Sequence, residues 1–163
     1  MGMVEISPSG NLAAYSVDFK GDETCGLYVK SLIDADDKDD DNDDKAADDD
    51  RDDKALMDHD GPLEVDGTVI WGSDDTTLFY LKMDEAHRPH QLYRRRIGKS
   101  SPKGSAAADN DADDELLFQE DDELFWVHAY KSFDSRYLFV TSGSKETSEK
   151  DLYAWTQNSS SSS

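Results

Sequence analysis

The sequence predicts an all-β fold, because one unit of two short strands joined by a polar loop occurs three times along it. Each copy begins with a turn rich in Ser, Gly and Asp, continues with an apolar strand and ends, after the loop, at a Leu-Tyr pair. In every copy, one residue of the apolar strand and the tyrosine of the Leu-Tyr pair are thirteen positions apart. No segment shows a convincing helical period. The three pairs are Tyr15 with Tyr28, Tyr80 with Tyr93, and Val140 with Tyr153.

The first copy is expected to supply four strands. Residues 4–6 alternate apolar and polar side chains, and residues 7–11 (SPSGN) have turn chemistry, because Pro fixes φ and Gly or Asn tolerates a positive φ. Residues 12–17 and 26–32 are rich in side chains that favour strands. Residues 55–58 form a weaker fourth strand, and Gly and Pro at 61–62 mark a turn after it.

The second and third copies repeat this order of strands and turns. Ser, Asp and Gly clusters again separate short runs of Thr, Val, Leu and aromatic residues, which is the pattern of strands joined by tight turns. The second copy is expected to have four strands and the third to have three. The predicted strands are residues 68–71, 77–83, 90–97 and 116–119, followed by 124–131, 137–141 and 152–155.

The spacing of the copies indicates a propeller. The copies start about 65 and 60 residues apart, and without two acidic insertions these spacings approach the 40 to 50 residues of a four-stranded blade. We therefore predict an incomplete β-propeller of about two and a half to three four-stranded antiparallel blades; a small β-sandwich or meander is the alternative. Because a ring needs about four to eight blades, we expect a fragment of a larger protein, or a chain that pairs with a partner.

Acidic residues are concentrated in the two insertions, residues 34–54 and 99–115. The first holds thirteen Asp, and the whole chain has a formal net charge of -21. Such segments repel themselves and have no apolar surface to bury, so we expect both to be disordered. The predicted organisation is a partial N-terminal propeller domain over residues 1–158 and a poly-Ser tail over 159–163.

The composition also excludes several classes of protein. The negative charge argues against nucleic acid, which requires Lys and Arg, and against an anionic membrane surface. No apolar run approaches the ~20 residues of a spanning helix, and residues 1–10 lack the features of a signal peptide. Cys25 is the only cysteine, so no internal disulfide is possible and a cytoplasmic location is expected.

Two short motifs resemble catalytic or metal sites, but their context favours loops. Residues 142–145 match S-x-x-K, in which the Lys activates the Ser from the next turn of a helix; here the motif follows a strand and contains Gly, which predicts a polar hairpin loop. His87 and His90 flank Arg88 and Pro89. A metal pair there lacks a completing Cys or acidic cluster, so a loop that ties neighbouring blades is the preferred interpretation.

Three further groups of residues have a functional and a structural interpretation. Asp residues at 36–44 suggest calcium, but the windows that begin at 37, 39 and 41 lack the Gly and Glu of an EF-hand, so diffuse accumulation of cations is expected instead. Residues 94–96 (RRR) are either a basic patch or a solvated or internally paired face. Three tryptophans are expected to pack the blades rather than to stack on a ligand: Trp71, Trp126 and Trp155.

Residues 7–32, 71–98 and 132–153 resemble the N-terminal β-propeller of oligopeptidase B enzymes in the prolyl oligopeptidase family of serine peptidases. The specific runs are LAAYSVDFKGDE with LYVK, LFYLKMDEAHRP, and SGSKETSE. The resemblance covers most of residues 3–155 and excludes the two insertions. It implies a seven-bladed propeller that caps an α/β-hydrolase domain, limits access to short peptides and belongs to an enzyme with a Ser-Asp-His triad that cleaves after Arg or Lys.

None of the family's catalytic residues falls on this chain, and the sequence has no G-x-S-x-G nucleophile motif. We therefore expect no catalytic, cofactor or metal residue here and a chain that is inactive alone. The expected function is a fragment of the gating propeller, whose partners are the parent's hydrolase domain and its short peptide substrates. The alternative is a non-enzymatic interaction module whose acidic loops recruit basic ligands. A third hypothesis is a gene-model remnant without function.

Overall fold

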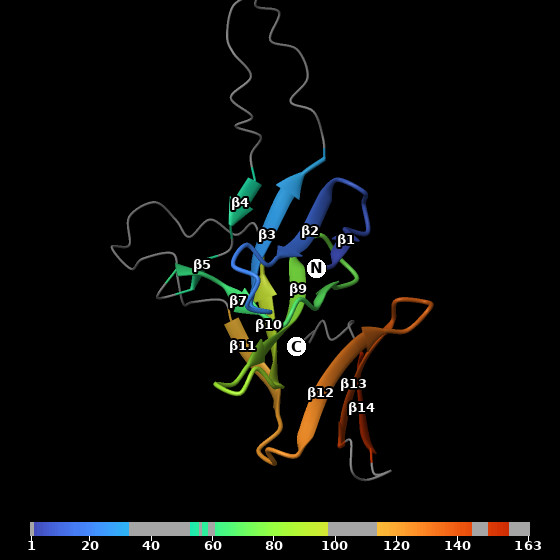
Figure 1. Cartoon of the computed structure of the whole chain (residues 1–163). Helices are drawn as coiled ribbons and strands as arrows, with labels where there is room; N and C mark the ends of the chain where they lie inside the picture. The colour runs from blue at the N-terminus through green and yellow to red at the C-terminus, as the bar shows by residue number, and fades with distance from the viewer. Residues whose placement is uncertain are drawn as a thin grey trace, which may run out of the picture.

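The computed structural model describes residues 2–32, 53–55, 57–58, 61–97, 114–144 and 150–156. Over these ranges every regular element is a strand, which confirms the all-β prediction. The strands form three main antiparallel sheets that follow one another along the chain, from the blue first sheet through the green second to the orange third (Figure 1). In the same ranges no helix is long and apolar enough to cross a membrane.

The first sheet contains β1 (Val4–Ile6), β2 (Leu12–Val17), β3 (Cys25–Ser31) and β4 (Asp53–Ala55) in spatial order, and β7 (Glu64–Val65) also pairs with β3. Turns join the strands: Gly10 has a φ of 80°, which glycine adopts easily, and its N–H donates to the Ser7 carbonyl over 2.9 Å. β5 (Met57–Asp58) and β6 (Gly61–Pro62) form a separate small hairpin.

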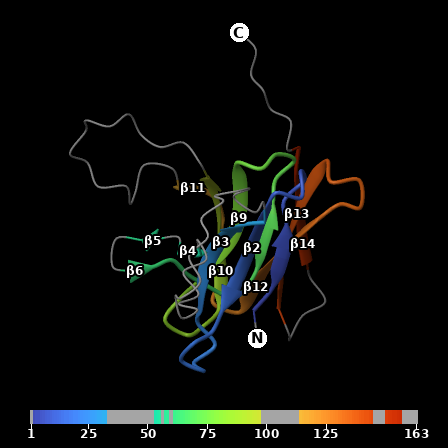
Figure 2. The same cartoon turned by 90° about the horizontal axis from the view of Figure 1, so that it is seen from above.

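The second and third sheets repeat the plan of the first. The second contains β8 (Val69–Trp71), β9 (Thr77–Met83), β10 (Pro89–Arg96) and β11 (Asp114–Gln119) in spatial order. The third contains β12 (Phe125–Lys131), β13 (Tyr137–Ser144) and β14 (Lys150–Thr156). Seen from above, strands of the three sheets lie alongside one another, with contacts between β1 and β8 and between β10 and β12 (Figure 2).

The thirteen-residue spacing is the register of the sheets. Tyr15 lies directly opposite Tyr28, and Tyr80 opposite Tyr93, while the third pair of the repeat also consists of direct partners. The Tyr15 and Tyr28 rings stack with centroids 5.4 Å apart, and the Tyr80 and Tyr93 rings with centroids 5.6 Å apart. Such cross-strand aromatic pairs stabilise a sheet. The repeat therefore marks equivalent strand pairs in three successive sheets.

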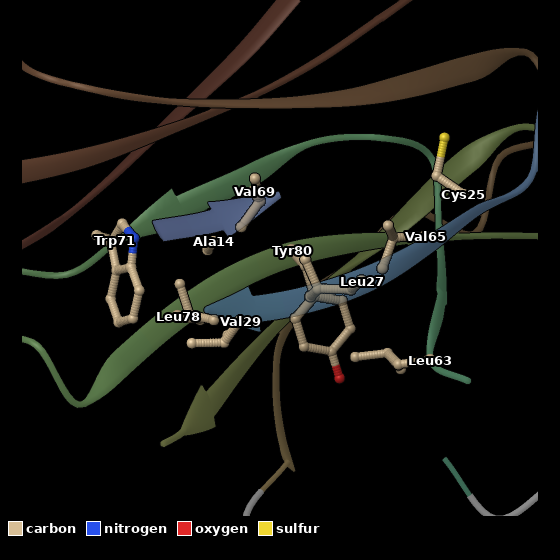
Figure 3. Close-up of a cluster of buried hydrophobic side chains, with 10 residues drawn as sticks. All are labelled: Ala14, Cys25, Leu27, Val29, Leu63, Val65, Val69, Trp71, Leu78 and Tyr80. Atoms are coloured by element: carbon tan, nitrogen blue, oxygen red, sulfur yellow. The ribbon is translucent and has the colours of Figure 1, made fainter. Parts of the chain in front are cut away.

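Two apolar cores lie between the sheets. The first joins the first and second sheets, and its side chains converge from the blue and green strands in Figure 3. The second joins the second and third sheets. The four residues at 78–81 (LFYL) are all buried, because Leu78 and Tyr80 face the first core while Phe79 and Leu81 face the second. A strand buried on both faces has a continuous apolar run.

The structure corrects some predicted boundaries. β4 begins at Asp53 and β11 at Asp114, so the C-terminal ends of the predicted insertions (34–54 and 99–115) each include two strand residues. The predicted strand at 55–58 is divided between β4 and β5, and the predicted turn at 61–62 is β6. The very short β7 was not predicted, because two residues are too few for alternation to be recognised. The proposed disorder of the insertions lies outside the described residues.

Candidate functional site between the sheets

The first strands of the three sheets are linked by one polar cluster. Lys131 of β12 donates from Nζ to Glu5 Oε1 over 2.6 Å, and the Trp71 backbone N–H donates to Glu5 Oε2 over 2.6 Å. The Trp71 indole Nε1 donates to the Glu5 carbonyl over 2.9 Å, and Lys131 also donates to the Trp71 carbonyl over 3.3 Å. The two bonds to the Glu5 carboxylate are charge-assisted, which makes them shorter and stronger than bonds between neutral groups. The Glu5–Trp71–Lys131 cluster therefore ties three successive sheets together.

This cluster gives a measurable coupling energy. In a double-mutant cycle with Glu5→Gln and Lys131→Met, we expect the two losses of unfolding free energy to couple by about 1 kcal/mol, because the ion pair is mostly buried, with side chains 25% and 21% exposed. The exposed pair Lys20–Glu64, 69% and 63% exposed, is the matched control and is expected to couple by about 0–0.5 kcal/mol. Urea unfolding measures both cycles. Equal coupling in the two cycles contradicts a special role for the cluster.

A second tie joins the second sheet to the third through Arg88. Its Nε donates to Asp84 Oδ2 over 2.8 Å, and its Nη1 donates to the carbonyls of Asp122 and Phe125 over 2.8 and 2.7 Å. The side chain is 8% exposed. The interpretation of this loop as a tie between blades is therefore correct, but the residue that makes it is Arg88 and not the flanking histidines.

The two histidines around Arg88 have different settings. His87 is exposed, has a φ of 57° and lies in the turn between β9 and β10, where its N–H donates to the Asp84 carbonyl over 3.0 Å. His90 is half-buried in β10. Among the described residues, no group of three or more His, Cys, Asp or Glu side chains is arranged to hold a metal ion. The possible calcium windows at 36–44 lie outside those residues.

Asp66, in the loop before β8, is the one described carboxyl whose pKa is raised. Burial disfavours its charged form and outweighs the hydrogen bonds that it accepts from the Thr68 N–H and Oγ1, at 2.7 and 3.0 Å, and the attraction of His128. A folded-state pKa above the unfolded value means that ionisation of Asp66 destabilises the fold. The stabilising neutral form is present below pH 3.8 and is lost as the pH rises through the folded pKa.

We therefore expect the Asp66→Asn variant to gain stability relative to the wild type as the pH rises from about 3.5 to 7. Asn keeps one oxygen acceptor for Thr68 but carries no charge to desolvate. The difference between the two urea midpoints, measured across this range, cancels the contributions of all other titrating groups. A difference that does not change with pH, or that favours the wild type increasingly at neutral pH, contradicts the prediction.

The arginines at 94–96 form part of an internally paired face, which the sequence offered as the alternative to a basic patch. Arg95 donates from Nε and Nη2 to the two carboxylate oxygens of Asp114, over 2.6 and 2.7 Å, and both side chains are 10% exposed. Arg94 pairs with Glu115. These pairs hold the end of β10 against the start of β11, the two strands that the chain segment 97–113 connects. They occupy two of the three arginines.

The S-x-x-K motif does not lie in the predicted hairpin loop. Ser142, Gly143 and Ser144 are in β13, where Ser142 is fully buried and its Oγ donates to a Glu120 carboxylate oxygen. A strand points alternate side chains to opposite faces, so it lacks the helical turn that such a catalytic pair needs. Lys145 lies outside the described residues. Ser142 anchors the segment that connects the second and third sheets.

The tryptophans have unequal roles in packing. Trp71 is fully buried in the first core, as predicted. Trp126 is half-buried in β12 and faces away from the second core, and Trp155 pairs with Leu138 in the register of β13 and β14. Sequence reasoning missed the Glu5–Lys131 pair. Its residues are 126 positions apart, and no local pattern relates them.

Comparisons with known proteins agree with this architecture. The family model described as the prolyl oligopeptidase N-terminal β-propeller domain matches residues 1–162. Protease 2 of Moraxella lacunata is 36% identical over 83 residues, which are 51% of this chain and 11% of that protein. The chain thus spans a small part of that relative.

Solved structures share the fold at lower identity. Oligopeptidase B from Leishmania major has a TM-score of 0.70 at 24% identity, over 96% of this chain and 18% of that one. Oligopeptidase B from Trypanosoma brucei has a TM-score of 0.61 at 23% identity, over 96% and 17%. Together with the repeated four-strand order, these matches confirm the predicted incomplete β-propeller. The chain belongs to the family of prolyl oligopeptidase N-terminal β-propeller domains.

Proposed function

We propose that this chain is part of the substrate-gating propeller of an oligopeptidase B-like serine endopeptidase. In this proposal a separate α/β-hydrolase domain of the parent polypeptide cleaves short peptides after Arg or Lys, and the chain itself is not catalytic. The observation that carries the proposal is the family match over residues 1–162. The name of the Moraxella relative, Protease 2, supports the same class of activity.

The ties between the sheets support a role as a filter. A propeller that admits only short peptides must keep its opening narrow, which requires neighbouring blades that do not separate easily. The Glu5–Trp71–Lys131 cluster and the Arg88 contacts each bridge different sheets through short, charge-assisted hydrogen bonds. Both would oppose widening of the gap between blades.

The charge of the chain supports basic peptides as substrates. A net charge of -21 produces a negative field that attracts cationic peptides and raises their rate of encounter. The same charge supports peptide partners rather than nucleic acid or an anionic membrane surface. The only cysteine, Cys25, is buried and free, which supports a reducing, cytoplasmic location.

The test begins with the transcript downstream of the codon for Ser163. We expect the reading frame to continue through further blades to a G-x-S-x-G segment. The encoded protein should hydrolyse a short fluorogenic peptide that ends in Arg at least tenfold faster than one that ends in Leu, and faster than a long unfolded polypeptide that contains the same site. The 163-residue chain alone should release no fluorophore. A frame that stops at Ser163 in every transcript, or a product without this preference, overturns the proposal.

A non-enzymatic interaction module is the second candidate, and two exposed sheet faces favour it. Val4 and Ile6 of the first sheet are 66% and 50% exposed, and Tyr130 of the third is 49% exposed. Apolar faces of this kind mark contact surfaces. In this case the 163-residue chain should fold cooperatively and bind a basic partner saturably. A broad, non-cooperative thermal transition of the isolated chain would count against it.

A further inference from the structure

The outer edge of the second sheet has no partner among the described strands. β11 is the last strand in the spatial order β11-β10-β9-β8, and β10 is the described strand that pairs with it. The first and third sheets pack against the two faces of this sheet, where the two apolar cores lie. Further blades would pack on the free faces of those two sheets, so they would leave the outer edge of β11 on the rim of the ring, uncovered.

The side chains of β11 leave an apolar site at this edge. The two carboxylates at its start are already paired with arginines of β10. Leu117 and Phe118 both pack against the second core, because a bulge at Leu117 interrupts the alternation of the strand. Leu116 is 45% exposed. Apart from the bulge, β11 lacks the features that commonly protect an edge strand, since it contains neither Lys nor Pro and its charges are paired.

The C-terminal end of the edge is acidic. Residues 120–123 (EDDE) follow β11, and Asp121, Asp122 and Glu123 are exposed. Asp121 accepts a hydrogen bond from the neutral Gln119 amide over 2.6 Å. Within the described ranges, no ion pair involves Asp121 or Glu123. A molecule bound along the outer edge therefore meets uncompensated negative charge at this end.

We propose that the outer edge of β11 binds a free linear peptide as an added antiparallel strand, with Lys or Arg at the N-terminal end of the peptide. The strand pairs of the described sheets are antiparallel, and an antiparallel addition places the start of the peptide beside the end of β11. Its basic side chains then lie against Asp121 and Glu123. Backbone hydrogen bonds supply the affinity, as in other cases of strand addition, and the charges set the direction.

The same charges favour a free peptide over an internal segment of a protein. A free peptide carries an α-amino group, which adds a positive charge at the end that lies beside Asp121 and Glu123. An internal segment has no such group. Binding at the rim involves no cleavage, so this inference goes beyond the proposed peptidase role and does not depend on it.

Fluorescence anisotropy of a labelled peptide, titrated with the 163-residue chain, tests the proposal. The probe is the amide of Lys-Arg-Thr-Val-Thr-Val-Thr with the fluorophore at its C-terminal end. Binding should be saturable and should weaken as salt is raised. N-acetylation of the probe removes one charge and should weaken binding about threefold, which is the usual effect of one exposed charge pair. Of two probes N-methylated at Thr only or at Val only, one should lose binding and the other keep it, because alternate residues of an added strand bond to the edge.

Three variants of the chain locate the binding site. Leu116→Lys introduces a residue that protects edge strands and repels the basic probe, so it should weaken binding about tenfold or more. Asp121→Asn combined with Glu123→Gln should weaken binding about threefold to tenfold and remove the effect of N-acetylation. Phe133→Lys makes the same change of charge as Leu116→Lys, at a fully exposed residue in the turn between β12 and β13. This control should bind the probe as the wild type does.

Four results would overturn the proposal. Absence of saturable binding at submillimolar concentrations of the chain shows that the edge accepts no strand. Equal binding of the two N-methylated probes excludes backbone pairing, and equal binding of the acetylated and free probes excludes selection of a free N-terminus. Equal losses in Leu116→Lys and Phe133→Lys assign the effect to net charge rather than to the edge. If Leu116→Lys loses its β-sheet circular dichroism, the double variant, whose residues lie outside the strands, must show the expected loss. Any of these failures leaves the peptidase role untouched, because no arm measures cleavage.

Discussion

Replacement of Trp71 by alanine is expected to lower the free energy of unfolding by about 3–5 kcal/mol, the cost of removing a large, fully buried aromatic side chain. Trp71 is 0% exposed and lies in the first core against residues of both the first and second sheets. Its indole also donates to the Glu5 carbonyl over 2.9 Å. The substitution therefore leaves a cavity between two sheets and removes a hydrogen bond between β8 and β1.

Two other substitutions separate these causes. Trp71→Phe keeps most of the apolar volume but loses the indole N–H, so we expect a loss of about 1–3 kcal/mol, the cost of a lost hydrogen bond together with a small cavity. Trp126→Ala is the control, because Trp126 is half-buried in β12 on the side away from the second core, and this substitution should cost less than either. Urea unfolding followed by far-ultraviolet circular dichroism avoids the loss of the Trp71 fluorescence. A Trp71→Ala variant no less stable than Trp126→Ala refutes this account of the core.

The sequence could predict the strands and their partners because both depend on local patterns. Alternation along a strand and the length of a hairpin determine which residues lie opposite each other. The spacing of Tyr80 and Tyr93 along the chain was therefore enough to predict that they pair. Because two further pairs have the same spacing, the number and order of the sheets followed as well. The end of β13 was placed too early, since its apolar alternation stops near Thr141 while its backbone pairing continues to Ser144.

The contacts between sheets could not be predicted in this way. Arg88 donates to two backbone carbonyls more than thirty residues away, and every residue has a carbonyl, so no side-chain pattern identifies these acceptors. Glu5 and Lys131 meet only because three sheets pack in succession. Which residues meet between the sheets thus depends on how the blades are stacked. This stacking depends on the whole sequence rather than on any short run of it.

Replacement of Arg88 by methionine is expected to cost about 3–5 kcal/mol of unfolding free energy, because it removes three charge-assisted hydrogen bonds from a side chain that is only 8% exposed. Methionine retains apolar volume but donates to none of the three acceptors, which are Asp84 and the Asp122 and Phe125 carbonyls. Arg88→Lys keeps the charge without the planar fork and should recover only part of the loss. Arg136→Met is the control, since the Arg136–Asp134 pair is exposed and its loss should not change the urea midpoint.

The position of Arg88 also predicts which sheet becomes less stable when Arg88 is replaced. Arg88 joins the turn between β9 and β10 to the start of β12, so its loss should loosen the third sheet against the second while the first core stays intact. Native-state hydrogen exchange, which reports local opening, should then show faster exchange at the amides of β12 and β13 than in the wild type, with β2 and β3 nearly unchanged. Equal acceleration in all three sheets would mean that Arg88 supports the fold as a whole, and that the sheets are not joined by separate, local ties.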